Sequence, residues 1–191
     1  MKVPVMDAKL KHFLDELYAF GRREGGMWNV PPETAQFLRM LVIATGAARI
    51  LEIGTSNGYS TIWFALGAKV TGGKIVTLEN DPKKIAMARK NFAKAGVTEL
   101  IEQREGNALQ TLEKIEGQYD LVFIDGKKDE YLRYYQLALP RTRVGGLLLA
   151  DNATSHADEM PDFLKFVRHD NHVETVLVPI GSGLQMVVRL S

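Results

Sequence analysis

Residues 50–65 read ILEIGTSNGYSTIWFA, and this stretch decides the fold. A short apolar run ends in an acidic residue, passes through a turn of Gly, Thr, Ser and Asn, and continues into a second apolar run. The pattern is typical of a buried strand, a glycine-rich turn and a helix. Glycine lets a backbone approach a ligand closely, and the start of a helix offers free N–H groups. We therefore interpret the turn as a candidate binding loop.

The alternation of strand and helix continues along the chain. Strand-like runs are predicted at 49–53, 74–79, 100–105, 119–125 and 146–151, with helical stretches between each consecutive pair. Such alternation predicts a parallel sheet covered by helices on both faces. Residues 172–180 and 184–190 flank a Gly-Ser-Gly turn, which predicts an antiparallel hairpin at the C-terminal end. An N-terminal helix is expected over 7–23 with Asp7 as its N-cap, and a Gly and Pro loop then leads into a second helix that begins with Pro.

Composition limits the possible classes of protein. A chain of 191 residues fits one domain, and its 24 Lys and Arg nearly balance its 23 Asp and Glu. No strong field of one sign is present to attract a nucleic acid or an acidic membrane, so we expect neither partner. The absence of cysteine excludes disulfides and thiolate chemistry. The charged N-terminus and the lack of a long apolar run predict a soluble, cytoplasmic protein.

The polar residues at the ends of the first two strands indicate the ligand. Gly54 and Gly58 are separated by three residues, which does not match the dinucleotide pattern G-x-G-x-x-G. Glu52 is unfavourable beside a pyrophosphate and favourable beside a cation. Glu79 ends the second strand, where an acid accepts hydrogen bonds from ribose hydroxyls, although a solvated strand end is an equally good interpretation of Glu79 alone. A ribose together with a cation indicates S-adenosylmethionine.

A second group of polar residues lies at the ends of the fourth and fifth strands. Asp125 ends the fourth strand, and Asp151 and Asn152 end the fifth. In the usual order of such sheets these strands are adjacent to the first, so the three side chains converge on one rim. Two carboxylates and an amide oxygen suit Mg²⁺ or another divalent cation such as Mn²⁺ or Ca²⁺. The alternative is that these residues only cap the helices that follow.

Three motifs carry a resemblance to a known family. LEIGTSNGYST, FIDGKKDEYLRYY and GGLLLADN resemble the successive motifs of the cation-dependent class I S-adenosylmethionine O-methyltransferases, which include catechol and caffeoyl-CoA O-methyltransferases and small bacterial relatives. The resemblance extends over residues 27–190, and Ser56 stands where many members carry a glycine. It implies a single Rossmann-like domain over 1–191, with an N-terminal helix and lid loop in 1–30 and a mostly parallel seven-stranded core in 31–191. It also implies a homodimer.

The resemblance assigns roles to individual residues. Asp125, Asp151 and Asn152 match the metal ligands, and Lys128 matches the general base, whereas Lys127 is interpreted as a solvated charge. A lysine near a divalent cation and partly removed from water has a lowered pKa, which lets it take a phenolic proton. The acceptor would be a catechol-type hydroxyl that attacks the sulfonium methyl directly. The predicted cofactor-binding residues are Met27, Val30, Glu52, Gly54, Thr55, Ser56, Gly58, Ser60, Glu79, Asn80, Gly106, Asn107, Ala108 and Asp125.

Other residues have weaker interpretations. The loop GGMWNVPPE is expected over the active site, with Asn29 as a further contact and Trp28 as either a lid or a plug in the core. The segment ATSHADEMPDFL lacks the aromatic residue and glycine of many relatives, which leaves a permissive acceptor pocket. A lone His156 in this polar loop is more often structural than functional. Relatives often carry Asp in place of Ser182, and the two histidines of RHDNH are assigned to a helix end and turn.

Two alternative functions share the cofactor. One is a methyltransferase for another acceptor, such as an amine or a nucleic acid, although the fourth strand ends in FIDGKK rather than in the motif of base methylation. The other is a catalytically silent protein that binds S-adenosylmethionine. Nothing in a pocket for the cofactor alone requires Asp125, Lys128, Asp151 and Asn152 together.

Overall fold

The computed structural model describes residues 5–24 and 27–191. Residues 25 and 26 of the predicted lid loop lie outside the described residues. The helices are α1 (Ala8–Glu24), α2 (Pro32–Thr45), α3 (Tyr59–Thr71), α4 (Pro82–Ala95), α5 (Ala108–Lys114), α6 (Tyr131–Ala138) and α7 (Pro161–Val167). The strands are β1 (Arg49–Ile53), β2 (Lys74–Glu79), β3 (Ile101–Glu105), β4 (Tyr119–Ile124), β5 (Thr142–Ala150), β6 (Val173–Val178) and β7 (Leu184–Arg189). Within this described part, no helix is both long and apolar enough to span a membrane.

The seven strands form one sheet in the order β3-β2-β1-β4-β5-β7-β6. β1 to β5 are parallel to one another, whereas β7 lies between β5 and β6 and is antiparallel to both. The predicted mostly parallel sheet with a C-terminal hairpin is confirmed. β1 is flanked by β2 and β4, so the chain reverses its direction of progress across the sheet between these strands. Ligands of open α/β sheets bind at such a switch point.

Local sequence explains where the first helices begin and end. The Asp7 carboxylate accepts a hydrogen bond from the Leu10 N–H at 2.8 Å, so the predicted N-cap of α1 is confirmed. α2 starts at Pro32, whose missing N–H costs nothing in a first helical turn, and ends before Gly46, which has φ of 66°. The left-handed Gly46 ends α2 three residues before β1 begins at Arg49.

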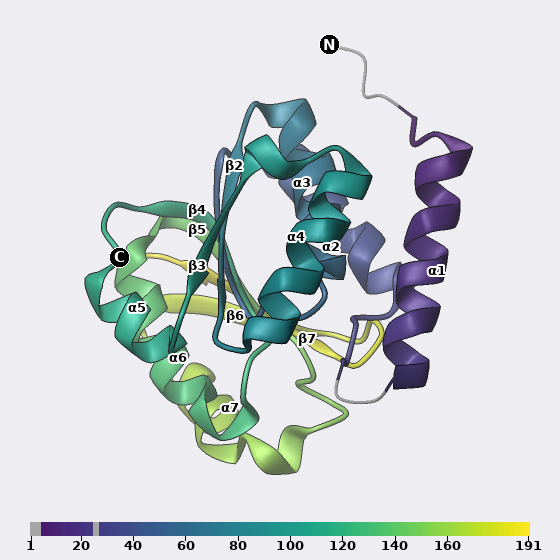
Figure 1. The fold of residues 1–191 in the computed structure, drawn as a ribbon. Coiled ribbons are helices and arrows are strands. Elements are labelled where there is room, and N and C mark those ends of the chain that lie inside the picture. The colour runs from purple at the N-terminus through teal and green to yellow at the C-terminus, as the bar shows by residue number, and fades with distance from the viewer. Residues whose placement is uncertain (1–4, 25–26) are drawn as a thin grey trace.

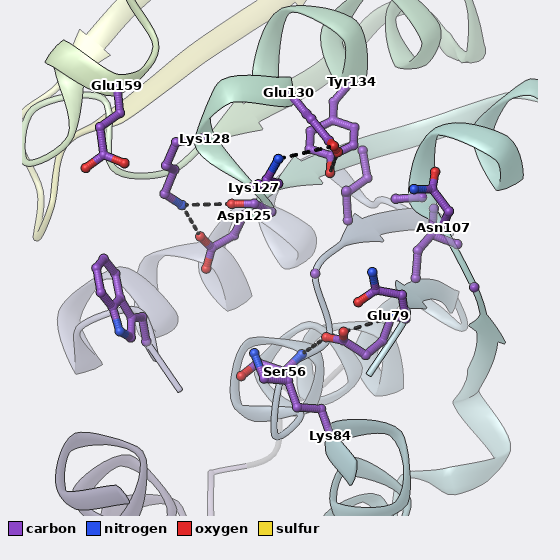
Figure 2. A pocket seen from close by; sticks show the side chains of 18 residues that line it. Ser56, Glu79, Lys84, Asn107, Asp125, Lys127, Lys128, Glu130, Tyr134 and Glu159 are labelled. Carbon is purple, nitrogen blue, oxygen red and sulfur yellow. Dashed lines mark hydrogen bonds and ion pairs between the residues drawn. The ribbon is translucent and has the colours of Figure 1, made fainter. Parts of the chain in front are cut away.

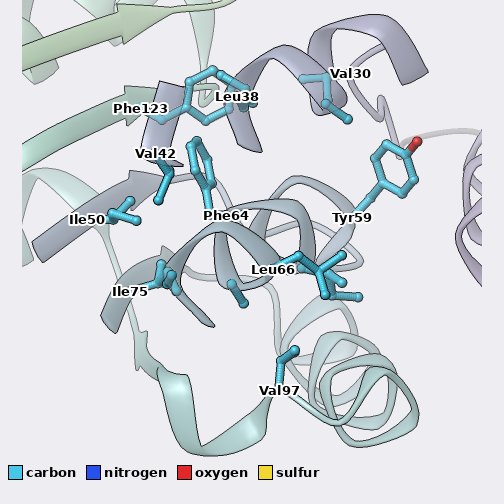
Figure 3. Packing of buried hydrophobic residues seen from close by; sticks show 14 of the residues in the cluster. Val30, Leu38, Val42, Ile50, Tyr59, Phe64, Leu66, Ile75, Val97 and Phe123 are labelled. Atoms are coloured by element: carbon cyan, nitrogen blue, oxygen red, sulfur yellow. The ribbon is translucent and has the colours of Figure 1, made fainter. Parts of the chain in front are cut away.

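Each central strand is buried on both faces, with alternate residues in different clusters. Ile50 and Phe123 belong to the cluster under α1 to α4, whereas Leu51 and Val122 belong to the cluster under α5 to α7. Figure 1 shows these two groups of helices on opposite sides of the sheet. Figure 3 shows Leu38, Val42 and Phe64 packed with Ile50 and Phe123 on the first side. The side-chain period of two therefore produces a three-layer fold.

β5 begins earlier than the sequence indicates. The predicted strand starts at residue 146, but the structure extends it back to Thr142 through Gly145 and Gly146. Gly145 has φ of 73°, and the pairing of β4 with β5 shifts register between Tyr119 and Leu121. Two consecutive glycines are typical of a turn, and here they form an irregularity within a strand.

Asp120 joins the beginnings of three strands. One oxygen of its carboxylate accepts the N–H groups of Ala48 and Arg49 at 2.9 and 2.8 Å, and the other accepts Arg143 Nε at 2.6 Å. Partial burial raises the pKa of Asp120, but these hydrogen bonds outweigh it, and the pKa falls below its ordinary value of 3.8. The ionised carboxylate therefore connects β4 to the start of β1 and to β5.

We predict that Asp120→Asn lowers the free energy of unfolding by about 1–3 kcal/mol at neutral pH, because the N–H groups of Ala48 and Arg49 and the Arg143 side chain lose a charged acceptor. A depressed pKa in the folded state stabilises the protein above the unfolded-state pKa and loses this effect as pH falls through the folded-state pKa. The difference between variant and wild type should therefore shrink below about pH 4. Denaturant titrations at several pH values measure it, with the exposed Glu116→Gln as a control. An equal difference at every pH would contradict the charge-based account.

Candidate functional site

A pocket of ≈ 560 Å³ lies where the parallel strands end, a volume typical of small-molecule sites. Figure 2 shows Ser56, Glu79 and Asn107 at one end of it and Asp125, Lys128 and Glu159 at the other. The residues that line the pocket are Trp28, Ile53, Gly54, Ser56, Leu78, Glu79, Asn80, Lys84, Gly106, Asn107, Ala108, Asp125, Gly126, Lys127, Lys128, Glu130, Tyr134 and Glu159. The pocket therefore joins the glycine-rich turn to the carboxylate of β4.

The turn after β1 requires glycine at its first position. Gly54 has φ of 101°, and a Cβ atom there would lie 2.1 Å from the Asp125 carbonyl oxygen. Ser56 also has a left-handed φ, of 50°, and Gly58 has φ of 88° with its Cα facing the Phe92 ring. Three left-handed residues turn the chain back toward α3, and Ser56 adopts at some cost a conformation that suits glycine.

Glu79 is held rigidly on the pocket wall. Its carboxylate accepts the N–H groups of Ser56 and Asn80, both at 2.9 Å, and that of Asp81 at 3.1 Å. These bonds connect the end of β2 to the turn after β1. Oε1 accepts two of these bonds and Oε2 accepts one, so Oε2 keeps capacity for a ligand hydroxyl.

Glu52 lies under the turn and has no exposed surface. Its carboxylate accepts hydrogen bonds from Ser60 at 2.6 Å, from Thr77 at 2.6 Å and from Thr61. Burial raises the pKa of Glu52 to about 7, although the three hydroxyl groups act in the opposite direction. The predicted contact with a cationic ligand stays a prediction, and in this structure Ile53, the next residue of β1, reaches the pocket wall instead.

Asp125 and Lys128 form a nearly buried ion pair at the other end of the pocket. Lys128 Nζ lies 3.0 Å from Asp125 Oδ1, and the two side chains are 12% and 15% exposed. The same ammonium donates to the Gly126 carbonyl at 3.2 Å and to the Tyr131 hydroxyl at 2.9 Å. Three donors thus meet three acceptors, which fixes the position of the amine.

Asp151 lies behind this ion pair with an unsatisfied oxygen. The residue is 2% exposed, and its Oδ1 atom has no hydrogen-bond partner among the described residues. Burial, followed by the nearby charge of Asp125, raises the pKa of Asp151 to about 7. A buried carboxylate with a free oxygen beside a second carboxylate is a set that a hard cation satisfies.

Asn152 completes the predicted metal set in a left-handed conformation, with φ of 63°. Asparagine tolerates this conformation better than most residues, and its Nδ2 donates to Ser155 Oγ at 3.3 Å. No group of three or more His, Cys, Asp or Glu side chains in the described ranges can hold a metal ion. The predicted site has only two carboxylates with an amide, and these three residues fit a cation that keeps water or substrate in its open positions.

Half of the predicted cofactor and metal residues line the pocket and half lie around it. Val30 is 2% exposed and belongs to the core, and Asn29 donates its side-chain amide to the Leu17 carbonyl at 3.2 Å. This part of the loop therefore supports α1. The predicted residues found on the wall are Gly54, Ser56, Glu79, Asn80, Gly106, Asn107, Ala108, Asp125 and Lys128. Those found off the wall are Met27, Val30, Glu52, Thr55, Gly58, Ser60, Asp151 and Asn152.

The sequence analysis missed several residues of the wall. Tyr134 and Glu130 are four residues apart at the start of α6, and the tyrosine hydroxyl donates to the glutamate. This i, i+4 spacing was a usable signal, because such pairs share one helix face. Trp28 is 66% exposed, so the structure rejects the core plug and leaves the lid. Ile53, Leu78, Lys84, Gly126, Lys127 and Glu159 are the other missed wall residues.

Solved structures with the same fold include methyltransferases. The O-methyltransferase from Bacillus cereus in complex with SAH has a TM-score of 0.83 and is 30% identical, with coverage of 97% of this chain and 92% of that one. An O-methyltransferase structure from Klebsiella pneumoniae gives the same TM-score and identity, with coverage of 98% and 92%. The fold is therefore that of the Rossmann-like O-methyltransferases.

Sequence comparison defines the family more closely. A family model described as O-methyltransferase matches residues 6–190, so the chain belongs to this O-methyltransferase family. A catechol O-methyltransferase from Niastella koreensis is 43% identical over 128 residues, which are 65% of this chain and 58% of that protein. Caffeoyl-CoA O-methyltransferase 1 from Eucalyptus globulus is 31% identical over 190 residues, with coverage of 86% and 77%. The match therefore spans little more than half the length of the bacterial relative.

We predict that the stability difference between wild type and Glu52→Gln depends on pH. The raised pKa means that the folded state binds the Glu52 proton more tightly than the unfolded state, whose pKa is about 4.5. The stabilisation that this proton gives the folded state is complete below pH 4.5 and is lost as pH rises to about 7. The free energy of unfolding of wild type should therefore fall by about 3 kcal/mol relative to that of the variant over this range, as denaturant titrations would measure. A difference that does not change with pH would show that the carboxylate is ionised throughout.

Proposed function

We propose that this protein is an S-adenosylmethionine-dependent, divalent-metal-dependent O-methyltransferase that methylates a hydroxyl of a catechol-type small molecule. The observation that carries the proposal is the Asp125–Lys128 ion pair at one end of the pocket, with the buried Asp151 behind it, while Glu79 and the glycine-rich turn form the other end. One end suits a nucleoside and the other suits a hydroxyl that must lose a proton. Membership of the O-methyltransferase family supports the same reaction.

Binding of the methyl donor follows from the nucleoside end. S-adenosylmethionine supplies a methyl group on a sulfonium cation. Glu79 would accept hydrogen bonds from its ribose hydroxyls, and Gly106, Asn107 and Ala108 would lie beside its base. Gly54 lies close to the Asp125 backbone, which supports a bound geometry in which the methyl donor and the acceptor would be adjacent.

Proton removal falls to Lys128. Its Nζ atom lies 3.0 Å from Asp125 Oδ1, and from this position it would accept the proton of the acceptor hydroxyl. Tyr131 and the Gly126 carbonyl would then still hold the nitrogen in place. The acceptor O–H gives its proton to Nζ, a new O–C bond forms to the methyl carbon, and the C–S bond breaks to leave the neutral thioether product.

Asp125, Asp151 and Asn152 would hold the divalent cation. When bound, it supplies Lewis-acid stabilisation of the acceptor oxygen's negative charge and orients two neighbouring hydroxyls. The unsatisfied Asp151 oxygen and the two converging carboxylates support this assignment. Lys128 is within hydrogen-bond distance of Asp125, so the proposed base lies next to the proposed metal ligands.

The proposed reaction predicts methyl transfer from S-adenosylmethionine to a simple catechol, with Mg²⁺ present and with activity lost in excess chelator. Chromatography of the methylated product measures it. Asp151→Ala should abolish Mg²⁺ or Mn²⁺ binding by calorimetry as well as turnover. Full activity in chelator would remove the metal from the proposal, and cofactor binding without turnover on any catechol would remove the acceptor class.

Lys128→Ala should reduce kcat by about 10²- to 10⁴-fold and leave the affinity for S-adenosylhomocysteine near that of wild type, because the amine acts on the acceptor proton. Single-turnover kinetics and calorimetry separate the two effects. Lys114→Ala is the matched control, since this exposed lysine at the end of α5 does not line the pocket. Unchanged turnover in Lys128→Ala would remove the base assignment.

Further properties remain proposals. The resemblance to the family supports a homodimer in which the apolar face of α1 provides a contact. The near balance of charge supports a protein without a nucleic-acid or membrane partner, and the cytoplasm is the proposed location. Light scattering of the purified chain would measure its oligomeric state.

A further inference from the structure

The acceptor end of the pocket has a rim made of Trp28, His156 and Glu159, which come from two segments far apart in the chain. Trp28 and Glu159 line the pocket, and His156 lies between them. We propose that this rim ranks acceptors by charge, so that a catechol with a cationic side chain is preferred to one with an anionic side chain. The proposal rests on the proposed function, because it specifies which acceptors the same site takes.

The indole of Trp28 is available to a ligand. It is 66% exposed, and its ring centroid lies 5.1 Å from that of His156 at an interplanar angle of 43°. This contact holds the N-terminal loop against the segment after β5, since tilted ring pairs at this distance attract each other. An exposed indole face beside a pocket binds cations through its electron-rich surface and offers an anion no such attraction.

A chain of hydrogen bonds determines how His156 faces Glu159. Asn152 Nδ2 donates to Ser155 Oγ at 3.3 Å, and this oxygen lies 2.8 Å from His156 Nδ1. Nε2 of the same ring is 4.0 Å from Glu159 Oε1. The imidazole therefore contacts both Trp28 and Glu159, and the carboxylate stays on the wall of the pocket.

Among the described residues, the other two carboxylates that line the acceptor end, Asp125 and Glu130, each have a lysine within ion-pair distance, whereas Glu159 has none. Lys128 pairs with Asp125 at 3.0 Å, and Lys127 lies 2.8 Å from Asp129 and 3.8 Å from Glu130. Among the described residues, His156 is the sole basic side chain within ion-pair distance of Glu159. Lys84 lines the nucleoside end, near Ser56 in Figure 2. A substituent that leaves the pocket past the rim therefore meets a negative charge and an aromatic face.

A matched pair of acceptors tests the rim. 3,4-Dihydroxyphenethylamine and 3,4-dihydroxyphenylacetate carry the same catechol ring and differ in a terminal ammonium or carboxylate. We expect wild type to have a higher kcat/KM for the ammonium compound, mainly through KM. Glu159→Gln should reduce this ratio by about three- to fivefold, as expected for loss of an exposed charge pair. Trp28→Leu should reduce it by a similar factor, because it removes the aromatic face.

Two further measurements separate the rim from general effects. Glu116→Gln removes one negative charge before β4, at the end of that strand distant from the pocket, and should leave the ratio unchanged. In a Trp63→Phe background, Trp28 is the remaining tryptophan, and its fluorescence reports the affinity of both acceptors in the presence of S-adenosylhomocysteine without turnover. The ammonium compound should bind more tightly, and Glu159→Gln should reduce the difference in affinity between the two acceptors.

The outcomes distinguish the two proposals. If wild type and Glu159→Gln methylate both acceptors with the same ratio of kcat/KM values, the proposed charge selection by the rim is wrong and the O-methyltransferase function is unaffected. A preference of wild type for the carboxylate compound would contradict the charge selection in the same way. No methylation of either acceptor or of catechol itself, with S-adenosylhomocysteine bound, would remove the proposed acceptor class and the rim with it.

Discussion

The close approach of β1 and β4 at Gly54 is the constraint on which the rest of the site depends. A Cβ atom at this residue would lie 2.1 Å from the Asp125 carbonyl oxygen, so any side chain would push the two strand ends apart. The approach places the turn after β1 and the carboxylate after β4 beside one pocket. β5 follows next in the sheet and brings Asp151 within electrostatic range of Asp125. Backbone packing thus decides where the polar groups meet.

The two buried carboxylates at this switch point, Glu52 and Asp151, differ in how far their oxygens are hydrogen-bonded. Glu52 is surrounded by the hydroxyl groups of Ser60, Thr61 and Thr77, which repay part of the cost of removing a charge from water. Asp151 has an oxygen without a described partner, and Asn152 beside it has a left-handed backbone. Unpaired polar atoms and unusual backbone angles gather at functional sites. The contrast separates an acid whose hydrogen bonds support the turn from one that keeps an oxygen without a described partner.

The residues that follow strand ends were predictable, because parallel strands end at one edge of the sheet whatever the details of packing. Glu79 and Asp125 therefore lie on the pocket wall as expected. Glu52, one residue before the end of β1, lies off the wall, and so does Val30, which was expected there as part of the loop before α2. Val30 is drawn into the core by the packing of its loop, and the alternation of β1 turns Glu52 under the turn while Ile53 reaches the wall. These outcomes depend on contacts between distant segments.

By itself, the sequence determined the order of strands and helices, the C-terminal hairpin and the glycine-rich turn, because apolar periodicity and turn residues act locally. Only the tertiary structure decided that β5 runs through Gly145 and Gly146, that Glu79 accepts the N–H of Ser56, and that Trp28 lies against His156. The last pair joins residues more than a hundred positions apart. Such contacts follow from the packing of whole elements on the sheet, and no local pattern in the chain encodes them.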